Sequence, residues 1–445
     1  MIERRFKACH FLPITRACDR ETPGTWRYGD GIICKGVVML DKLLIVLVGI
    51  PARGKSTMAR KIARTFELDD LQAQVFNNGE LRRALSDENT SLPEFFSPDN
   101  EKGVAFRDKC ARINLEKARN FLINSGNVAI IDASNVSRKR RKVIEEMFAD
   151  VPILFIECVN ADAEALEANL ERKGFLKEFR HLPAHVALDR FTRRIGFYES
   201  AYEPLREERN RILVDSFEAC ILQEHITDLI PFYDRIRDII TTRIVRNLFL
   251  LRHGETFFNI ENRIGGDSGL TEKGRAQAEA LARYFSPWRL PIIFTSNYKR
   301  TKQTASPIAE RQEHCSIIAL PEFNEIDAGI CDGMTYQEIK EKQPQVAEAR
   351  RRDKYGYVYP RGEGYAAMEK RIYRGVQKVF YLNNLDDNIM IVGHQAINRM
   401  ILSYFISRPK GEVPYIYMPQ NRYYHIQVDP NKRIFELLPY TNSAR

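Results

Sequence analysis

The sequence predicts two α/β domains in succession, and three observations support this. Short, continuous apolar runs alternate with amphipathic helical patterns, as is typical of strands buried in a parallel sheet. This alternation restarts near residue 240. The chain has 445 residues, which is enough for two or three domains of about 100–200 residues each. We therefore expect an extension over residues 1–40, one domain over 41–245 and a second over 246–445.

In the first domain, the apolar run Leu43–Ile50 is bounded by glycine and proline and predicts a strand buried on both faces. Residues 1–40 show no sustained periodicity. Further strands are expected at Ala73–Phe76, Asn127–Asp132 and Ile153–Cys158, and helices at Ser56–Phe66 and Phe106–Asn124. Strands that alternate with helices indicate βαβ units.

The second domain repeats this pattern after a helix-like segment at Leu229–Ile244. Apolar strands are expected at Asn247–Arg252, Ile292–Thr295 and Ile389–Val392, and a helix at Thr271–Phe285. Charged or polar residues follow each of these strands directly. Ligands of open α/β sheets bind outside the carboxyl ends of the strands, so these residues are candidates for a site.

Composition excludes several classes of protein. The hydrophobic fraction of 44% argues against wholesale disorder, and the longest apolar run, Leu43–Ile50, is far below the roughly 18–20 residues of a membrane span. The charged start, Met1–Cys9, lacks the apolar segment of a secretory signal. Eight dispersed cysteines without metal-ligand spacing indicate a reduced protein, and we expect a cytoplasmic location.

The formal net charge of +9 is a small excess over a long chain, with no basic tail and no nucleic-acid motif. Arginines placed to hold small phosphates explain it better than nucleic acid does. We therefore expect no nucleic-acid partner and no membrane partner.

The segment Gly49-Ile50-Pro51-Ala52-Arg53-Gly54-Lys55-Ser56 fits the pattern G-x-x-x-x-G-K-[ST] completely. Such a turn points successive backbone N–H groups at the phosphates of a nucleotide, and the helix that follows adds its partial positive charge. Lys55 can reach the β- and γ-phosphates, and the Ser56 hydroxyl can bind Mg²⁺. The alternative is a plain strand–turn–helix connection.

Asp132 ends the strand at Asn127–Asp132, at the edge where ligands bind. It could bind Mg²⁺ or orient an acceptor hydroxyl, or it could cap the following helix, a role that Ser134 or Asn135 could also take. Spacing alone does not select ligands among the arginines at 82, 83, 107, 138, 140, 193 and 194.

A second group of residues suits phosphoryl transfer to a histidine. His253 follows a buried strand, and Arg252 beside it can neutralise phosphate oxygens. His394 ends another strand and is the candidate partner of His253. Arg300 is a further candidate phosphate clamp, and Glu325 is the candidate acid for the leaving hydroxyl.

These motifs together resemble the bifunctional 6-phosphofructo-2-kinase/fructose-2,6-bisphosphatase family, from about Leu43 to about Tyr417. The kinase half is matched by residues 49–56, 75–83, 95–100, 132–135 and 198–205, and the phosphatase half by 263–270, 324–329 and 394–396. The His253 motif alone resembles only the wider histidine phosphatase superfamily. The resemblance implies an N-terminal P-loop kinase and a C-terminal histidine phosphatase of the phosphoglycerate mutase-like fold.

For the first domain, the resemblance implies that ATP and Mg²⁺ are the cofactors. ATP would contact Gly49, Ile50, Pro51, Ala52, Arg53, Gly54, Lys55, Ser56, Thr57, Asn169 and Lys173, and the metal Ser56 and Asp132. Fructose 6-phosphate would contact Arg82, Arg107, Ser134, Arg140, Arg194 and Tyr198. Lys55 and Asp132 take the catalytic positions.

For the second domain, it implies a phosphohistidine at His253 and a proton donor at Glu325, with His394 and Arg252 as further catalytic residues. The sugar bisphosphate would contact Arg252, Asn259, Gly265, Tyr336, Arg350, Lys354, Tyr365, Gln395 and Arg399. Arg300 joins this set because of its position after a strand, and not because of the resemblance. The partners are then small sugar phosphates, and the chain is expected to form a homodimer.

The implied activity is synthesis and hydrolysis of fructose 2,6-bisphosphate, which controls glycolysis against gluconeogenesis. Ser134 replaces the family's usual threonine, Asn160 its usual cysteine, and Lys173 needs a one-residue gap to keep its register. These departures leave open an alternative, a bisphosphatase with a weak kinase domain. A nucleic-acid end-processing enzyme and an inactive scaffold are the other readings. The missing nucleic-acid motifs argue against the former, and the intact Lys55 and His253 against the latter.

Overall fold

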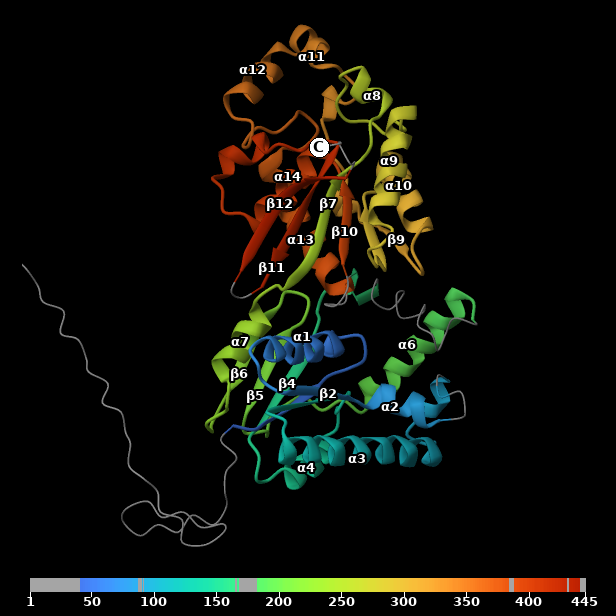
Figure 1. The fold of residues 1–445 in the computed structure, drawn as a ribbon, viewed down its shortest axis with the longest axis vertical. Coiled ribbons are helices and arrows are strands. Elements are labelled where there is room, and N and C mark those ends of the chain that lie inside the picture. Colours follow the sequence, from blue (N-terminus) through green and yellow to red (C-terminus); the bar gives the residue numbers. More distant parts are fainter. Residues whose placement is uncertain are drawn as a thin grey trace, which may run out of the picture.

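A computed structural model describes residues 41–86, 90, 92–164, 166–167, 182–383, 388–429 and 432–440. It contains two six-stranded sheets, one in each half of the chain, stacked along the long axis of the molecule (Figure 1). Both halves are α/β, as predicted. Among the described residues, no helix has the length and apolar character needed to cross a lipid bilayer.

The first sheet has the strand order β2-β3-β1-β4-β5-β6. Its pairs are parallel from β2 to β5, and β6 is antiparallel to β5. The strands are β1 (Leu43–Val48), β2 (Ala73–Asn77), β3 (Val128–Asp132), β4 (Ile153–Val159), β5 (Arg211–Asp215) and β6 (Cys220–His225). β1 lies at the centre and is wholly buried, as its continuous apolar run predicts.

The helices of this half are α1 (Lys55–Leu68), α2 (Asn78–Leu85), η1 (Pro93–Phe96), α3 (Glu101–Asn124), α4 (Arg138–Met147), α6 (Ala184–Ser200) and α7 (Tyr233–Thr241). Apolar residues of α1 and α7 pack on one face of the sheet, and those of α3 and α4 on the other. The predicted strands and helices are all present, with shifted ends.

Two helix ends differ from the prediction for local reasons. α3 begins at Glu101, five residues early, because the Asn100 side chain accepts a hydrogen bond from the Gly103 N–H and caps the helix. α7 covers only Tyr233–Thr241 of the segment Leu229–Ile244, because Phe232, with φ 61°, is left-handed and not helical.

The second sheet has the order β12-β11-β7-β10-β8-β9. β7, β10, β8 and β9 are parallel, and β11 and β12 continue the sheet in antiparallel fashion. The strands are β7 (Val245–Arg252), β8 (Ile292–Thr295), β9 (Ser316–Ala319), β10 (Ile389–Gly393), β11 (Arg422–Val428) and β12 (Arg433–Pro439). β7 starts the second sheet at Val245, and we propose the division near residue 245 as the domain boundary.

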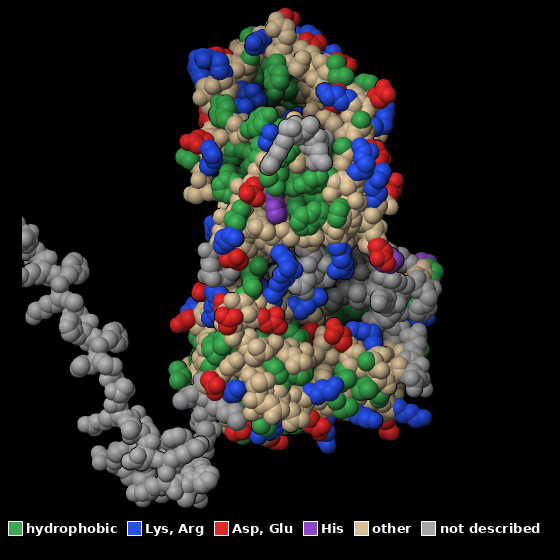
Figure 2. Space-filling model, viewed as in Figure 1, with side chains coloured by type: hydrophobic (Ala, Val, Ile, Leu, Met, Phe, Trp, Pro, Cys, Tyr) green, Lys and Arg blue, Asp and Glu red, His purple; other side chains and the backbone are tan. Residues whose placement is uncertain are grey.

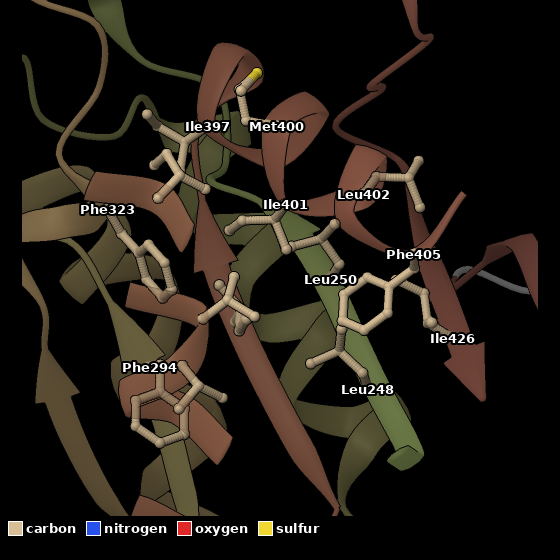
Figure 3. Packing of buried hydrophobic residues seen from close by; sticks show 14 of the residues in the cluster. Leu248, Leu250, Phe294, Phe323, Ile397, Met400, Ile401, Leu402, Phe405 and Ile426 are labelled. Carbon is tan, nitrogen blue, oxygen red and sulfur yellow. The ribbon is translucent and has the colours of Figure 1, made fainter. Parts of the chain in front are cut away.

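The helices here are α8 (Phe257–Ile260), α9 (Glu272–Phe285), α10 (Lys299–Glu310), η2 (Pro321–Phe323), η3 (Gly329–Cys331), α11 (Tyr336–Lys342), α12 (Pro344–Arg352), α13 (Tyr365–Leu382), α14 (Gln395–Phe405) and η4 (Lys410–Tyr415). α13 and α14 cover one face of the sheet, and α9 and α10 the other. Figure 3 shows α14 residues such as Ile401 and Phe405 packed over Leu248 and Leu250 of β7.

The two halves share buried contacts. Phe217, which follows β5, belongs to the same apolar cluster as Tyr381 of α13, and their ring centres lie 5.7 Å apart. On the face seen in Figure 2, Lys and Arg side chains are concentrated near the level where the two halves meet. Arg374 of α13 pairs with Asp162, which follows β4, at 2.9 Å, so the halves contact one another through both apolar and charged groups.

Candidate functional sites

The first candidate site lies at the carboxyl end of β1, where the loop Gly49–Gly54 connects to α1. Both glycines have positive φ, 135° at Gly49 and 78° at Gly54. A Cβ on Gly49 would lie 2.6 Å from the Cys158 carbonyl oxygen, and one on Gly54 would lie 2.7 Å from Ser216 Cβ. Both positions therefore require glycine. The loop leads directly into α1, whose N-terminal N–H groups favour an anion.

Lys55, the first residue of α1, is buried, and its Nζ donates to the Ile50 carbonyl at 2.7 Å. Burial lowers the pKa of Lys55 to about 8, and the nearby carboxylate of Asp132 opposes this shift. β1 and β3 are adjacent and parallel, so the loop after β1 and Asp132 at the end of β3 lie at the same edge. The structure thus places the nucleotide loop and Asp132 at the same edge of the first sheet, as the sequence predicts.

Asp132 is buried, and one of its carboxylate oxygens accepts a hydrogen bond from Asn77 Nδ2. It does not cap α4. Ser137 does so, by accepting from the Arg140 N–H at 3.4 Å, so Ser134 and Asn135 are not the caps either. Asp132 and Ser56 line one cavity, and a carboxylate with a hydroxyl is an oxygen donor set that suits Mg²⁺ beside nucleotide phosphates.

This cavity has a volume of about 530 Å³. The residues that line it include the predicted sugar-phosphate contacts Arg82, Arg107, Ser134, Arg140, Arg194 and Tyr198, together with Pro51, Ala52, Gly54, Lys55, Ser56 and Thr57 of the loop. Arg83 also lines it. Arg138 and Arg193 instead form ion pairs, with Glu145 at 2.6 Å and Glu94 at 2.7 Å.

Three arginines of the cavity converge on one aromatic ring to which the sequence analysis assigned no role. The guanidinium carbons of Arg194, Arg82 and Arg107 lie 4.0, 4.9 and 5.6 Å from the ring centre of Phe96. Phe96 is buried in η1, between helices α2, α3 and α6 that carry the arginines. Stacking on this ring holds guanidinium groups from distant segments together. An aromatic pair at 95–96 gave no signal of this in the sequence.

Three departures from the family pattern concern this site. Ser134 lines the cavity and so keeps a hydroxyl there. Asn160 lies just past β4, and its Oδ1 accepts from the Asp162 N–H at 2.8 Å. Neither observation favours a weak kinase. Asn169 and Lys173 lie outside the described residues.

The second candidate site lies where β7, β10 and β8 end side by side. His253 follows β7, and its N–H donates to the Gly393 carbonyl at the end of β10. His394 follows β10. Both imidazoles are buried, with ring centres 5.3 Å apart. The strand-end histidines therefore meet, as the sequence predicted.

Hydrogen bonds assign the proton of each ring. His253 Nδ1 lies 2.8 Å from the Gly254 carbonyl oxygen, which only accepts, so Nδ1 carries the proton and Nε2 has the free lone pair. Arg300 Nε donates to His394 Nδ1 at 3.1 Å, so His394 is protonated at Nε2, which donates to Ser296 Oγ at 2.8 Å. Burial and the charges of neighbouring arginines hold the pKa of both histidines well below 6.5, so both are neutral.

The polar groups around His253 suit a phosphoryl group. Arg252 and Arg300 both line the cavity, and burial lowers the pKa of each while the charge of Glu325 raises it. The carboxylate of Glu325 accepts from the Ile326 N–H at 3.0 Å and the Ala396 N–H at 3.4 Å. A neutral nucleophile, two cations and a carboxylate thus share one cavity of about 330 Å³.

The other predicted contacts of this domain line the same cavity: Asn259, Gly265, Tyr336, Arg350, Lys354, Tyr365, Gln395 and Arg399. Arg399 Nη1 donates to the Tyr365 hydroxyl at 3.2 Å, which links α14 to the start of α13. Burial, together with the charges of Arg350 and Arg399, lowers the pKa of Lys354 to about 8. The cationic character of the wall comes mainly from arginines, which include Arg252, Arg300, Arg350 and Arg399.

Sequence reasoning missed the groups that hold these residues. Ser296 Oγ accepts from the Tyr298 N–H at 3.1 Å and lies 2.9 Å from Thr301 Oγ1. Thr304 Oγ1 accepts from the Gly254 N–H at 3.0 Å, and Gln420 Nε2 donates to the His253 carbonyl at 3.1 Å. No spacing in the sequence indicated the contacts of Thr304 and Gln420, since their partners lie 50 and 167 residues away in the chain.

Comparison with known proteins gives two family matches. The model described as 6-phosphofructo-2-kinase matches residues 35–254, and that of histidine phosphatase superfamily branch 1 matches residues 248–441. The chain is 35% identical over 402 residues to 6-phosphofructo-2-kinase/fructose-2,6-bisphosphatase 4 of Rattus norvegicus, covering 86% of this chain and 82% of the relative.

Two further matches differ in how much of the chain they cover. Homo sapiens 6-phosphofructo-2-kinase/fructose-2,6-bisphosphatase 3 is 33% identical, over 84% of this chain and 72% of the relative. Among solved structures, a putative alpha-ribazole-5'-P phosphatase from Escherichia coli covers 44% of this chain and is itself covered to 96%, with 22% identity and a TM-score of 0.41.

Proposed function

The chain belongs to the 6-phosphofructo-2-kinase/fructose-2,6-bisphosphatase family, and from this we propose that it catalyses both reactions on fructose 2,6-bisphosphate. The first domain transfers a phosphoryl group from ATP to fructose 6-phosphate, and the second removes it by hydrolysis. The observation that carries this proposal is the presence of two separate cationic cavities, one behind a nucleotide loop and one around a histidine with a free Nε2.

In the proposed kinase reaction, the C2 hydroxyl of fructose 6-phosphate attacks the γ-phosphorus of ATP, and ADP leaves. Asp132 accepts the proton of that hydroxyl, and Lys55 turns from the Ile50 carbonyl to the β- and γ-phosphates. Arg82, Arg107 and Arg194, which Phe96 holds together, bind the 6-phosphate. Ser56 and Asp132 would hold Mg²⁺, which would supply positive charge beside the phosphates.

In the proposed phosphatase reaction, His253 Nε2 attacks the phosphorus of the 2-phosphate, and the bond from phosphorus to the C2 oxygen breaks. Glu325 is the proton donor of this step: in the form that carries a proton, it gives that proton to the C2 oxygen, which releases fructose 6-phosphate. Arg252 and Arg300 neutralise the phosphoryl oxygens. Water then attacks the phosphohistidine and loses a proton to the Glu325 carboxylate, and inorganic phosphate leaves.

His394 acts differently from His253 in this scheme. Both of its ring nitrogens are engaged, one with Arg300 and the other with Ser296. We therefore assign it the task of orienting the Arg300 guanidinium, rather than that of donating a proton to the substrate. We further propose that the protein acts in the cytoplasm as a homodimer on small sugar phosphates.

The test is to incubate purified protein with Mg·ATP and fructose 6-phosphate, and separately with fructose 2,6-bisphosphate labelled with ³²P at C2. We expect fructose 2,6-bisphosphate and ADP from the first mixture. The second should yield labelled phosphate through an acid-labile, base-stable phosphoprotein. Absence of product in either mixture contradicts the proposal, and label taken up by a His253→Ala variant contradicts the assigned nucleophile.

A further inference from the structure

α13 connects the two candidate sites. It belongs to the second domain, and its first residue, Tyr365, lines the phosphatase cavity. One residue before its end, Tyr381 lines the cavity of the first domain beside the nucleotide loop. The nucleotide cavity is thus closed in part by a side chain that the kinase half of the sequence does not contain.

One side of α13 is fixed to the first domain by several contacts. Arg374 pairs with Asp162 at 2.9 Å, and Lys378 pairs with Glu164 at 2.8 Å. Arg374 also pairs with Glu164 at 3.3 Å. Residues 374, 378 and 381 are spaced four and three apart and so share a face of the helix. The position of Tyr381 against the loop is therefore held by the turns that precede it.

Tyr381 touches the loop itself. Its hydroxyl donates to the Ala52 carbonyl at 2.5 Å, and its side chain is buried. A Cβ on Gly54 would lie 3.7 Å from its ring, so ring and loop are in close contact. Ala52 has φ 69°, a left-handed conformation that alanine rarely adopts and that surrounding contacts must maintain.

The hydrogen bond from Tyr381 to Ala52 also affects how the loop can bind phosphates, because it fixes the orientation of a peptide group. The peptide between Ala52 and Arg53 is planar, so a fixed Ala52 carbonyl also fixes the direction of the Arg53 N–H. That N–H is one of the loop amides expected to face the phosphates. A loop held in this conformation before ATP arrives loses less conformational entropy on binding.

We propose that Tyr381 is a positioning residue for nucleotide binding, so that the second domain completes the ATP site of the first. This inference rests on the proposed kinase function. Tyr381 acts through the Ala52–Arg53 peptide and has no part in phosphate hydrolysis.

The chain supplies a matched control. Tyr373 lies on the same helix and also bonds the first domain through its hydroxyl, but to the exposed side of the interface at Glu218 and away from the loop. Tyr381→Phe and Tyr373→Phe each remove one interdomain hydroxyl and keep the ring. Only the first removes a bond to the nucleotide loop.

The experiment titrates Mg·ATP into full-length wild-type, Tyr381→Phe and Tyr373→Phe proteins by calorimetry, and then measures both KM values of the kinase. Loss of one hydrogen bond predicts about 2- to 12-fold weaker ATP binding and a similar rise in the ATP KM for Tyr381→Phe. The fructose 6-phosphate KM, the phosphatase rate and all values for Tyr373→Phe should stay at the wild-type level.

Equal ATP affinity in wild-type and Tyr381→Phe proteins overturns the inference. So does equal weakening in the two variants, or a parallel rise in both KM values, since either would mean a general role at the interface. A wild-type protein that binds no Mg·ATP would instead refute the kinase function on which the inference rests. The phosphatase rate of each variant reports whether the fold is intact.

Discussion

Replacing Ser296 with alanine should impair the phosphatase by releasing His394. Ser296 Oγ is the acceptor for His394 Nε2–H at 2.8 Å, and both residues are fully buried. The ring cannot escape by moving its proton to Nδ1, because Arg300 Nε donates to that atom. In the variant, either the His394 Nε2–H is left buried without an acceptor, or the hydrogen bond between His394 and Arg300 is lost.

The magnitude follows from the cost of an unsatisfied buried polar group, about 1–3 kcal/mol. If the whole cost falls on the orientation of Arg300 in the transition state, the rate of phosphoenzyme formation drops roughly 5- to 150-fold. The assay is rapid-quench uptake of ³²P from C2-labelled fructose 2,6-bisphosphate. Kinase turnover serves as the internal reference.

Ser306→Ala is the matched control, because Ser306 Oγ donates to Glu310 at 3.1 Å on the exposed side of α10. It should leave phosphoenzyme formation unchanged. A Ser296→Ala protein whose uptake rate stays within about twofold of the wild-type rate, below the smallest loss calculated above, would refute the role given to His394.

Three further predictions concern pH. The pKa of His253 is held well below 6.5, so phosphoenzyme formation should not fall between about pH 7.5 and 6.5, and a loss centred near 6.5 in rapid-quench profiles would be contrary to this. Burial lowers the pKa of Lys55 to about 8, so the calorimetric affinity for Mg·ATP should weaken above about pH 8, where the amine loses its charge. Unchanged affinity would count against a contact between Lys55 and the phosphates. Burial and the charge of Arg243 lower the pKa of Lys61 to about 7, whereas the unfolded chain keeps that proton to about pH 10. Lys61→Met should therefore raise the thermal midpoint of unfolding more at about pH 6.5 than at about pH 9.5, and equal gains at the two pH values would contradict this.

The sequence was sufficient where one continuous feature determines structure. The apolar runs of β1 and β8 are buried on both faces, and the residues directly after strands of one parallel sheet necessarily meet at one edge. This is why His253 and His394, far apart in the chain, were predicted to lie together.

The sequence was insufficient where a strand depends on pairing with its neighbours, or where a side chain is held by residues far away in the chain. β6 lies at a sheet edge and is largely exposed, so it has no apolar run, and β11 places buried residues among partly buried ones, with Arg422 exposed. The arginines around Phe96 come from three helices, and their choice rested on family resemblance. The bond from Tyr381 to Ala52 joins residues of different domains, and no spacing in the sequence reports it.

The central claim is that two chemically separate phosphoryl-transfer sites lie on one chain. Its most direct test measures both rates on Lys55→Met and His253→Ala proteins, with folding checked by circular dichroism. Lys55→Met should lose synthesis of fructose 2,6-bisphosphate, by about 10²–10³-fold or more, and keep hydrolysis. His253→Ala should lose hydrolysis and keep synthesis. Loss of both activities in either folded variant, or hydrolysis that persists without His253, would contradict the account.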